Sequence, residues 1–86
     1  DLKLQIAGLA EGHDQMVIRG DPAARSFACF YLAQGRLLAV DAVNSPREFM
    51  LSKPLIAAHA TPPAQALADP GVSLQDLQSV GAGDRR

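Results

Sequence analysis

The sequence has no tryptophan, a single cysteine and only four aromatic residues among its 86 residues. One cysteine, Cys29, excludes an internal disulfide and a cysteine-only metal site, and it is typical of a reducing compartment. All four aromatic residues lie between positions 27 and 49, which predicts a core centred on that part of the chain. A chain of this length is expected to form one small domain with modest stability.

Charge and hydrophobic runs exclude two further classes of protein. Eight Lys and Arg and nine Asp and Glu give a net charge of −1. The basic residues are scattered, so no nucleic-acid partner is expected. No apolar run approaches the roughly 20 residues that span a bilayer, and the first residues do not resemble a signal peptide. We therefore expect a soluble, cytoplasmic protein. The chain opens at Asp1, without Met and within a strand pattern, which suggests that upstream sequence is missing.

Apolar residues alternate with polar ones at the start of the chain, where Leu2, Leu4 and Ile6 share one face of a strand. Gln34-Gly35 lies between two apolar runs and predicts a tight hairpin, because glycine permits the positive φ that such a turn requires. The sequence thus predicts an α+β fold with an antiparallel sheet of about four strands, over residues 2–7, 15–19, 26–32 and 36–43. Both faces of the third and fourth strands are largely apolar, and on the fourth strand Asp41 interrupts the face that is predicted to hold Leu37, Ala39 and Val43.

A helix is predicted after the last strand. Ser45 to Glu48 fits a capping box, with Pro46 at the first helical position. The helix should cover residues 46–60, with a kink near Pro54 because an interior proline removes a hydrogen bond. Helical spacing directs four of its residues toward the sheet, namely Phe49, Met50, Lys53 and Ile56.

The rest of the chain adds little regular structure. One helical turn is possible at 64–68, and Ser73 is the expected N-cap of a short second helix over 73–80. Residues 1–80 would form the domain and residues 81–86 a disordered tail.

Four residues are candidates for chemistry, and each has a simpler structural interpretation. His13 and His59 lack metal-ligand spacing. Cys29 lies mid-strand among apolar residues, where a buried free thiol is ordinary. Asp41 interrupts an apolar face and is either solvated at a sheet edge or paired. Neither G-x-G-x-x-G nor the P-loop pattern occurs. We therefore assign no catalytic residue and no metal ligand, although a small hydrolase or isomerase using Asp41 or a histidine stays open as a minor hypothesis.

An ordered series of short motifs from Val17 to Ala57 resembles the C-terminal domain of FAD-dependent, NADH-using ferredoxin reductases. That group includes putidaredoxin reductase, rubredoxin reductases and the reductase components of ring-hydroxylating dioxygenases. The matching positions are Arg19-Gly20, Phe27, Phe30, Gly35, the strand from Leu37 to Val43, Asn44, Pro46, Phe49 and Lys53. Residues 1–9 and 66–77 also look like this family, so the resemblance covers nearly the whole chain.

The resemblance implies the interface domain of a larger flavoprotein with two dinucleotide-binding domains. FAD and NADH would be held by those other domains, since this chain has no cofactor fingerprint. The family's flavin-contacting tryptophan segment is absent, so cofactor-binding residues stay unassigned. The domain would cover the flavin site and help a ferredoxin-type iron–sulfur protein dock, or form a homodimer. It would have no activity alone. The alternative is a stand-alone binding or dimerisation module without a redox role.

Overall fold

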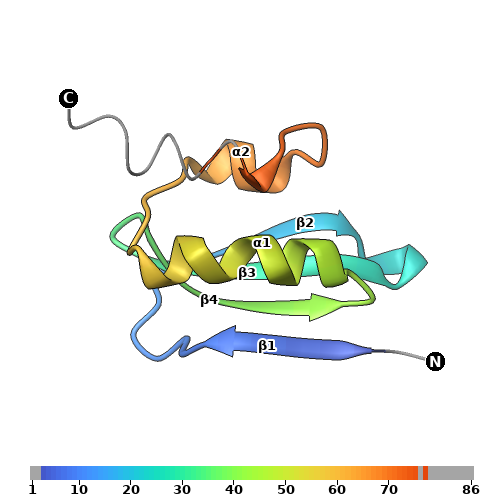
Figure 1. Cartoon of the computed structure of the whole chain (residues 1–86), viewed down its shortest axis with the longest axis horizontal. Coiled ribbons are helices and arrows are strands. Elements are labelled where there is room, and N and C mark those ends of the chain that lie inside the picture. Colours follow the sequence, from blue (N-terminus) through green and yellow to red (C-terminus); the bar gives the residue numbers. More distant parts are fainter. Residues whose placement is uncertain (1–2, 76, 78–86) are drawn as a thin grey trace.

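The computed structural model describes residues 3–75 and 77, which form a sheet layer and a helix layer (Figure 1). The sheet is antiparallel, with the strand order β1-β4-β3-β2. Its elements are β1 (Leu4–Gly8), β2 (Gln15–Asp21), the 3₁₀ turn η1 (Pro22–Ala24), β3 (Ser26–Ala33), β4 (Arg36–Val43), α1 (Pro46–Ala57) and α2 (Ala64–Ala68). The predicted α+β class and all four strands are confirmed, with boundaries that differ by two residues at most. Residues 81–86 and part of the predicted 73–80 helix lie outside the described residues.

The hairpin between β3 and β4 is closed by the two-residue turn that the sequence predicts. Gln34 and Gly35 both have positive φ, at 52° and 83°, which matches the twist of the flanking strands. The backbone N–H of Gln34 donates to a carboxylate oxygen of Asp14 at 3.0 Å. This bond ties the turn to the chain just before β2.

A β-bulge in β4 determines which side chains enter the core. Leu32 pairs with Leu37, but Tyr31 pairs with Ala39, so Leu38 is an extra residue in β4. A shift of one residue exchanges the two faces of a strand. The prediction that Leu37 shares a face with Asp41 is therefore wrong: Leu37 is 1% exposed and belongs to the core. In an unbroken ladder Asp41 would instead share the buried face of Phe30.

Asn44 holds the ends of three strands together at the end of β4. It has a positive φ of 50°, which asparagine tolerates better than most residues. Its side-chain oxygen accepts from the Lys3 N–H and its own N–H donates to the Lys3 carbonyl, both at 2.8 Å. Its side-chain nitrogen donates to the Arg25 carbonyl at 2.9 Å. These bonds give Asn44 a structural role at the junction between the sheet and α1.

α1 begins at Pro46, as predicted, but without the predicted capping box. The Ser45 side chain caps no helix N–H and instead donates to the Val43 carbonyl at 3.1 Å, because the chain bends sharply after the strand. The helix ends at Ala57, earlier than the predicted residue 60. His59 adopts a positive φ of 53°, which is incompatible with a continuing helix. α1 is continuous through Pro54, and the kink stays a prediction.

The sheet-facing side of α1 differs in part from the prediction. Phe49 and Ile56 pack against the core as predicted, and Ser52 and Leu55 are the buried residues of the helix. Met50, by contrast, is 60% exposed, and Lys53 is exposed. Ser52 can be buried because its hydroxyl donates to the Glu48 carbonyl at 2.5 Å, which satisfies its polar group. The Lys53 ammonium lies 4.5 Å from the centre of the Phe49 ring, a cation–π contact one helical turn apart.

The core lies between the sheet and the two helices. α1 packs over β4 and β1, and α2 packs over β2, on the same side of the sheet (Figure 1). The largest fully buried apolar side chains are Phe30, Leu32, Leu37, Val40, Leu55, Leu67 and Leu74. They come from the middle strands and from every segment that covers them, which confirms a core centred on the hairpin.

A buried arginine fastens the C-terminal segment to the sheet. Arg19, on β2, is 4% exposed. Its guanidinium donates to the carbonyls of Ala66 and Leu67, each at 3.3 Å, and to that of Val72. Its Nε atom lies 3.7 Å from the Glu48 carboxylate at the start of α1. The charge is thus compensated by an acid and by three backbone acceptors.

The predicted second helix is seen in part. Leu74, Gln75 and Leu77 are helical, and the Ser73 hydroxyl accepts from the Gln75 N–H at 3.2 Å, as expected of an N-cap. Leu74 and Leu77 are buried against the core. α2 confirms the helical turn predicted at 64–68.

Candidate functional surface: the open face of the sheet

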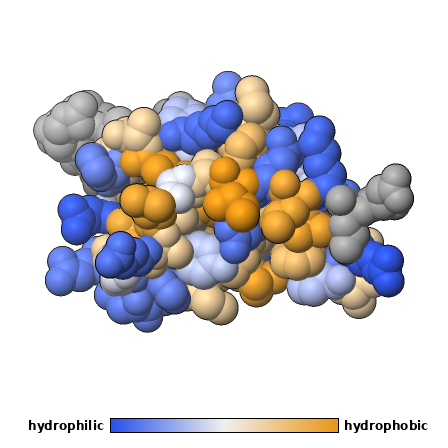
Figure 2. All heavy atoms as spheres, turned by 90° about the horizontal axis from the view of Figure 1, so that it is seen from below, coloured by the Kyte–Doolittle hydropathy of each residue, from blue (hydrophilic) through white to orange (hydrophobic). Residues whose placement is uncertain are grey.

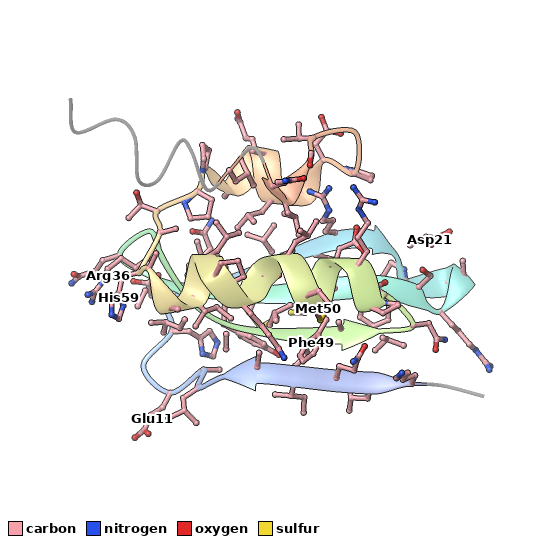
Figure 3. All side chains as sticks on the ribbon, in the orientation of Figure 1. Glu11, Asp21, Arg36, Phe49, Met50 and His59 are labelled. Atoms are coloured by element: carbon pink, nitrogen blue, oxygen red, sulfur yellow. The ribbon has the colours of Figure 1, made fainter. Side chains whose placement is uncertain are left out.

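The histidines and the cysteine do not assemble into a reactive site. His13 is exposed and lies edge-on to the Tyr31 ring, with ring centres 5.0 Å apart. His59 is exposed beside Arg36 at one end of the molecule (Figure 3). No group of three or more potential metal ligands occurs among residues 3–75 and 77. Cys29 is buried, and this burial raises the pKa of its thiol, with the Asp41 charge acting in the same direction. A thiol in that state is a poor nucleophile.

Within the part of the chain that the structure describes, no helix lies over one face of the sheet, and the side chains of this face are mainly apolar. Three cross-strand rows make up this open face, and their register follows from the pairing of the strands. The rows are Leu4, Val43, Phe27 and Gly20; Ile6, Asp41, Cys29 and Ile18; and Gly8, Ala39, Tyr31 and Met16. Four of these side chains are large, apolar and exposed, namely Leu4, Ile6, Met16 and Ile18.

The apolar surface continues around the β1 edge. Figure 2 views the molecule from the β1 side and shows hydrophobic side chains across the middle of the view, between hydrophilic groups at the ends. Leu9, just after β1, is also exposed. Contiguous exposed apolar surface of this kind marks an interaction site. The open face is therefore the candidate functional surface of the described chain.

A polar pair lies in the middle of the open face. The Tyr31 hydroxyl donates to the Asp41 carboxylate at 2.8 Å. This hydrogen bond is the main cause that raises the pKa of Tyr31 above its ordinary value, and a hydrogen bond with Cys29 adds to it. Of the two alternatives for Asp41, solvated at a sheet edge or paired, the structure shows the paired one. The partner is the phenol of Tyr31 on the neighbouring strand. The bulge brings both groups to one face, and the sequence shows no clear sign of it.

Three other charged residues lie away from the middle of the open face. Glu11 and Arg36 lie toward one end of the molecule and Asp21 toward the other (Figure 3). None of the described helices is long and apolar enough to cross a membrane. The exposed apolar side chains make the open face suited to packing against another protein surface, and its described residues offer no constellation for acid–base or nucleophilic chemistry.

The described sheet is covered by helices on one side and carries exposed apolar side chains on the other, an arrangement that offers a surface for packing against another protein. The chain belongs to the family described as "Reductase C-terminal", whose model matches residues 1–78. This finding confirms the family that the sequence motifs indicate, and the fold agrees with it.

Two curated relatives illustrate the match. The chain is 42% identical over 80 residues to the 5,5'-dehydrodivanillate O-demethylase ferredoxin reductase subunit of Sphingobium sp. (strain NBRC 103272 / SYK-6), covering 93% of this chain and 19% of that protein. It is 39% identical over 77 residues to putidaredoxin reductase of Pseudomonas putida, covering 90% of this chain and 18% of that protein. The chain therefore spans about a fifth of the length of these relatives.

A solved structure gives the same result for the fold. The crystal structure of the covalent putidaredoxin reductase–putidaredoxin complex contains a similar domain, with a TM-score of 0.87 and 37% identity. The match covers 94% of this chain and 19% of that chain. The relatives are oxidoreductases of electron transfer, and the present chain corresponds to their C-terminal part.

Proposed function

We propose that this chain is the C-terminal domain of a cytoplasmic FAD-dependent oxidoreductase that passes electrons from NADH to a ferredoxin-type iron–sulfur protein. The observation that carries the proposal is the family match over residues 1–78, combined with relatives that are named ferredoxin reductases and are about five times longer. The single cysteine, Cys29, suits a reducing compartment.

The cofactors belong to the rest of the parent protein in this proposal. A dinucleotide site needs a glycine-rich turn that opens a helix, so that backbone N–H groups meet the pyrophosphate. Here α1 follows Asn44-Ser45, and Gly8, Gly20 and Gly35 lie at strand ends or in the hairpin turn. The described residues do not fit FAD or NADH by themselves, and the chain alone is expected to be inactive.

The open face gives the domain its role. We expect the flavin-binding part of the parent protein to pack against it, which would bury Leu4, Ile6, Met16 and Ile18 and remove their apolar surface from water. The domain would then cover the flavin site from one side and contribute to the surface on which the iron–sulfur partner docks. The structure supports this role through the size and composition of the face and through the length of the relatives.

Cysteine accessibility tests the packing with a matched pair of positions. Ile6 and Met50 are each 60% exposed, on β1 and α1 respectively. In the 86-residue chain, Ile6→Cys and Met50→Cys should react with a maleimide at similar rates. In the parent protein, Ile6→Cys should react much more slowly while Met50→Cys keeps its rate, as read by mass spectrometry of each peptide. Equal rates for Ile6→Cys in the two proteins would contradict the packing.

The redox role has a separate test. The parent protein should show the visible absorbance of a bound flavin and should reduce a ferredoxin with NADH. A correctly folded parent protein without flavin would contradict the proposal.

The alternative of a stand-alone binding or dimerisation module draws on the same apolar face. Two copies could bury it against each other, since an exposed patch of this kind favours association. Sedimentation of the 86-residue chain over a range of concentrations, and the reading frame upstream of Asp1, separate the two ideas. A start codon just before Asp1 and a stable dimer would favour the module. A long upstream region with G-x-G-x-x-G after a strand would favour the reductase.

A further inference from the structure

Asp41 is the one charged residue among the three rows of the open face. Its cross-strand neighbours are Ile6 on β1 and Cys29 on β3. Along its own strand, Ala39 and Val43 flank it on the same face. The carboxylate therefore lies in an apolar setting that the rest of the described chain leaves without a helix above it. A charge at the centre of an interaction surface constrains what can cover that surface.

Tyr31 satisfies only part of the hydrogen-bonding capacity of this carboxylate. An ionised carboxylate has about four acceptor positions. Within residues 3–75 and 77, the Tyr31 hydroxyl is the one side-chain or backbone group that donates to it, and no basic side chain lies within ion-pair distance. Water can occupy the remaining positions while the face is open. A covering surface would exclude that water.

A covering surface that is apolar throughout would bury an unpaired charge, which is strongly unfavourable. A covering surface with one positive group opposite Asp41 would avoid this penalty and would also fix the orientation of the two surfaces. The surrounding side chains still require apolar contacts. The partner must therefore combine an apolar patch with a single cation at its centre.

We propose that the flavin-binding part of the parent protein presents an arginine or lysine side chain to Asp41, within an otherwise apolar patch that covers Ile6 and Ile18. The inference rests on the proposed function, because it names the chemistry of the surface that packs on the open face. Tyr31 is then a positioning residue, which holds the carboxylate oriented for its partner through the 2.8 Å hydrogen bond.

The test uses the parent protein carrying Ile6→Cys. The rate at which a maleimide reacts with the cysteine at position 6 measures how often the covering surface leaves the open face. Asp41→Leu should raise that rate about tenfold or more, because losing one partner leaves the other charge buried and unpaired. Asp41→Asn should raise it less, and Asp41→Glu should keep most of the protection. Tyr31→Phe should raise the rate less than Asp41→Leu does.

The 86-residue chain is the matched control. There the face is open, so Asp41→Leu should not change the rate at position 6, and the far-ultraviolet circular dichroism should show an intact fold. If Asp41→Leu leaves position 6 in the parent protein as protected as before, or more so, the covering surface is neutral and the inference is overturned. If position 6 is unprotected in the parent protein that keeps Asp41, no surface packs on the open face. That outcome would contradict the proposed packing itself and not only the cation opposite Asp41.

Discussion

At the scale of single residues, Tyr31 reports directly on the centre of the open face. It is the chain's one tyrosine, so tyrosinate absorbance follows its ionisation alone. The bond to Asp41 raises its pKa, and the folded chain should therefore titrate well above the usual value of about 10. Asp41→Asn should move the titration back toward that value. If Tyr31 titrates at the same pH in Asp41→Asn as in the unsubstituted 86-residue chain, the hydrogen bond to Asp41 does not form.

The same shift has a consequence for stability. A folded-state pKa above the unfolded one means that the bond contributes fully below about pH 10 and is lost as pH rises through the folded pKa. The free energy of unfolding should fall over that range in the native chain. In Tyr31→Phe this part of the decrease should be missing, and denaturant unfolding at a series of pH values measures the difference. An identical pH dependence in both chains would contradict the assignment.

Arg19 is the residue on which the C-terminal segment depends. Replacing it with methionine keeps much of the volume but leaves three carbonyls without their donor. Arg19→Met should lower the free energy of unfolding by about 2–5 kcal/mol. Hydrogen exchange should increase most over α2 and the turn that follows it. The exposed Arg36, replaced in the same way, should change stability by less than about 0.5 kcal/mol. Equal effects of the two replacements would contradict this role.

Residue identities explain which predictions the sequence could support. Gly35 marked the hairpin turn because its φ requirement is local, and Cys29 was correctly expected to be buried. Arg19 is distinguished in the sequence only as part of a family motif. Its acceptors are backbone carbonyls more than forty residues away, and no pattern of side chains marks them.

At the scale of elements, α1 contains two prolines in different positions. Pro46 occupies the first turn, where the missing N–H has no partner to lose. Pro54 lies within the helix and leaves the Met50 carbonyl without its usual donor. Pro54→Ala should raise the free energy of unfolding by about 1–3 kcal/mol. Thermal or urea unfolding measures it. Pro46→Ala should change stability by under about 0.5 kcal/mol. A decrease for Pro54→Ala would show that the proline stabilises the fold and would contradict this prediction.

The strands were predictable as elements, but their faces were not. Alternation and turn residues located all four strands to within two residues. The bulge at Leu38 exchanges the two faces of β4 for the side chains from Ala39 to Val43, compared with an unbroken alternation from Arg36. It places Asp41 on the open face and Leu37 in the core. A bulge depends on packing between strands, so the sequence alone predicts the alternation of side chains but not the register between strands.

At the scale of the whole molecule, the proposed function assigns the redox chemistry to the rest of the parent protein. The purified 86-residue chain should oxidise NADH at the rate of buffer alone, because it lacks a dinucleotide-binding turn. An absorbance assay with the parent protein as positive control measures this. Oxidation clearly above the buffer rate would contradict the assignment of the cofactors to the rest of the protein.

The strand order also dictates the sequence of events in folding. β1 precedes the other three strands along the chain, but within the described sheet its one strand neighbour is β4, the last of the four in sequence. The β3–β4 hairpin closes locally and quickly, whereas β1 must close a long loop before it gains a single ladder bond. We expect β1 to join last and to detach first. The strand that carries Leu4 and Ile6 would thus be the most easily exchanged part of the sheet until a second surface holds it in place.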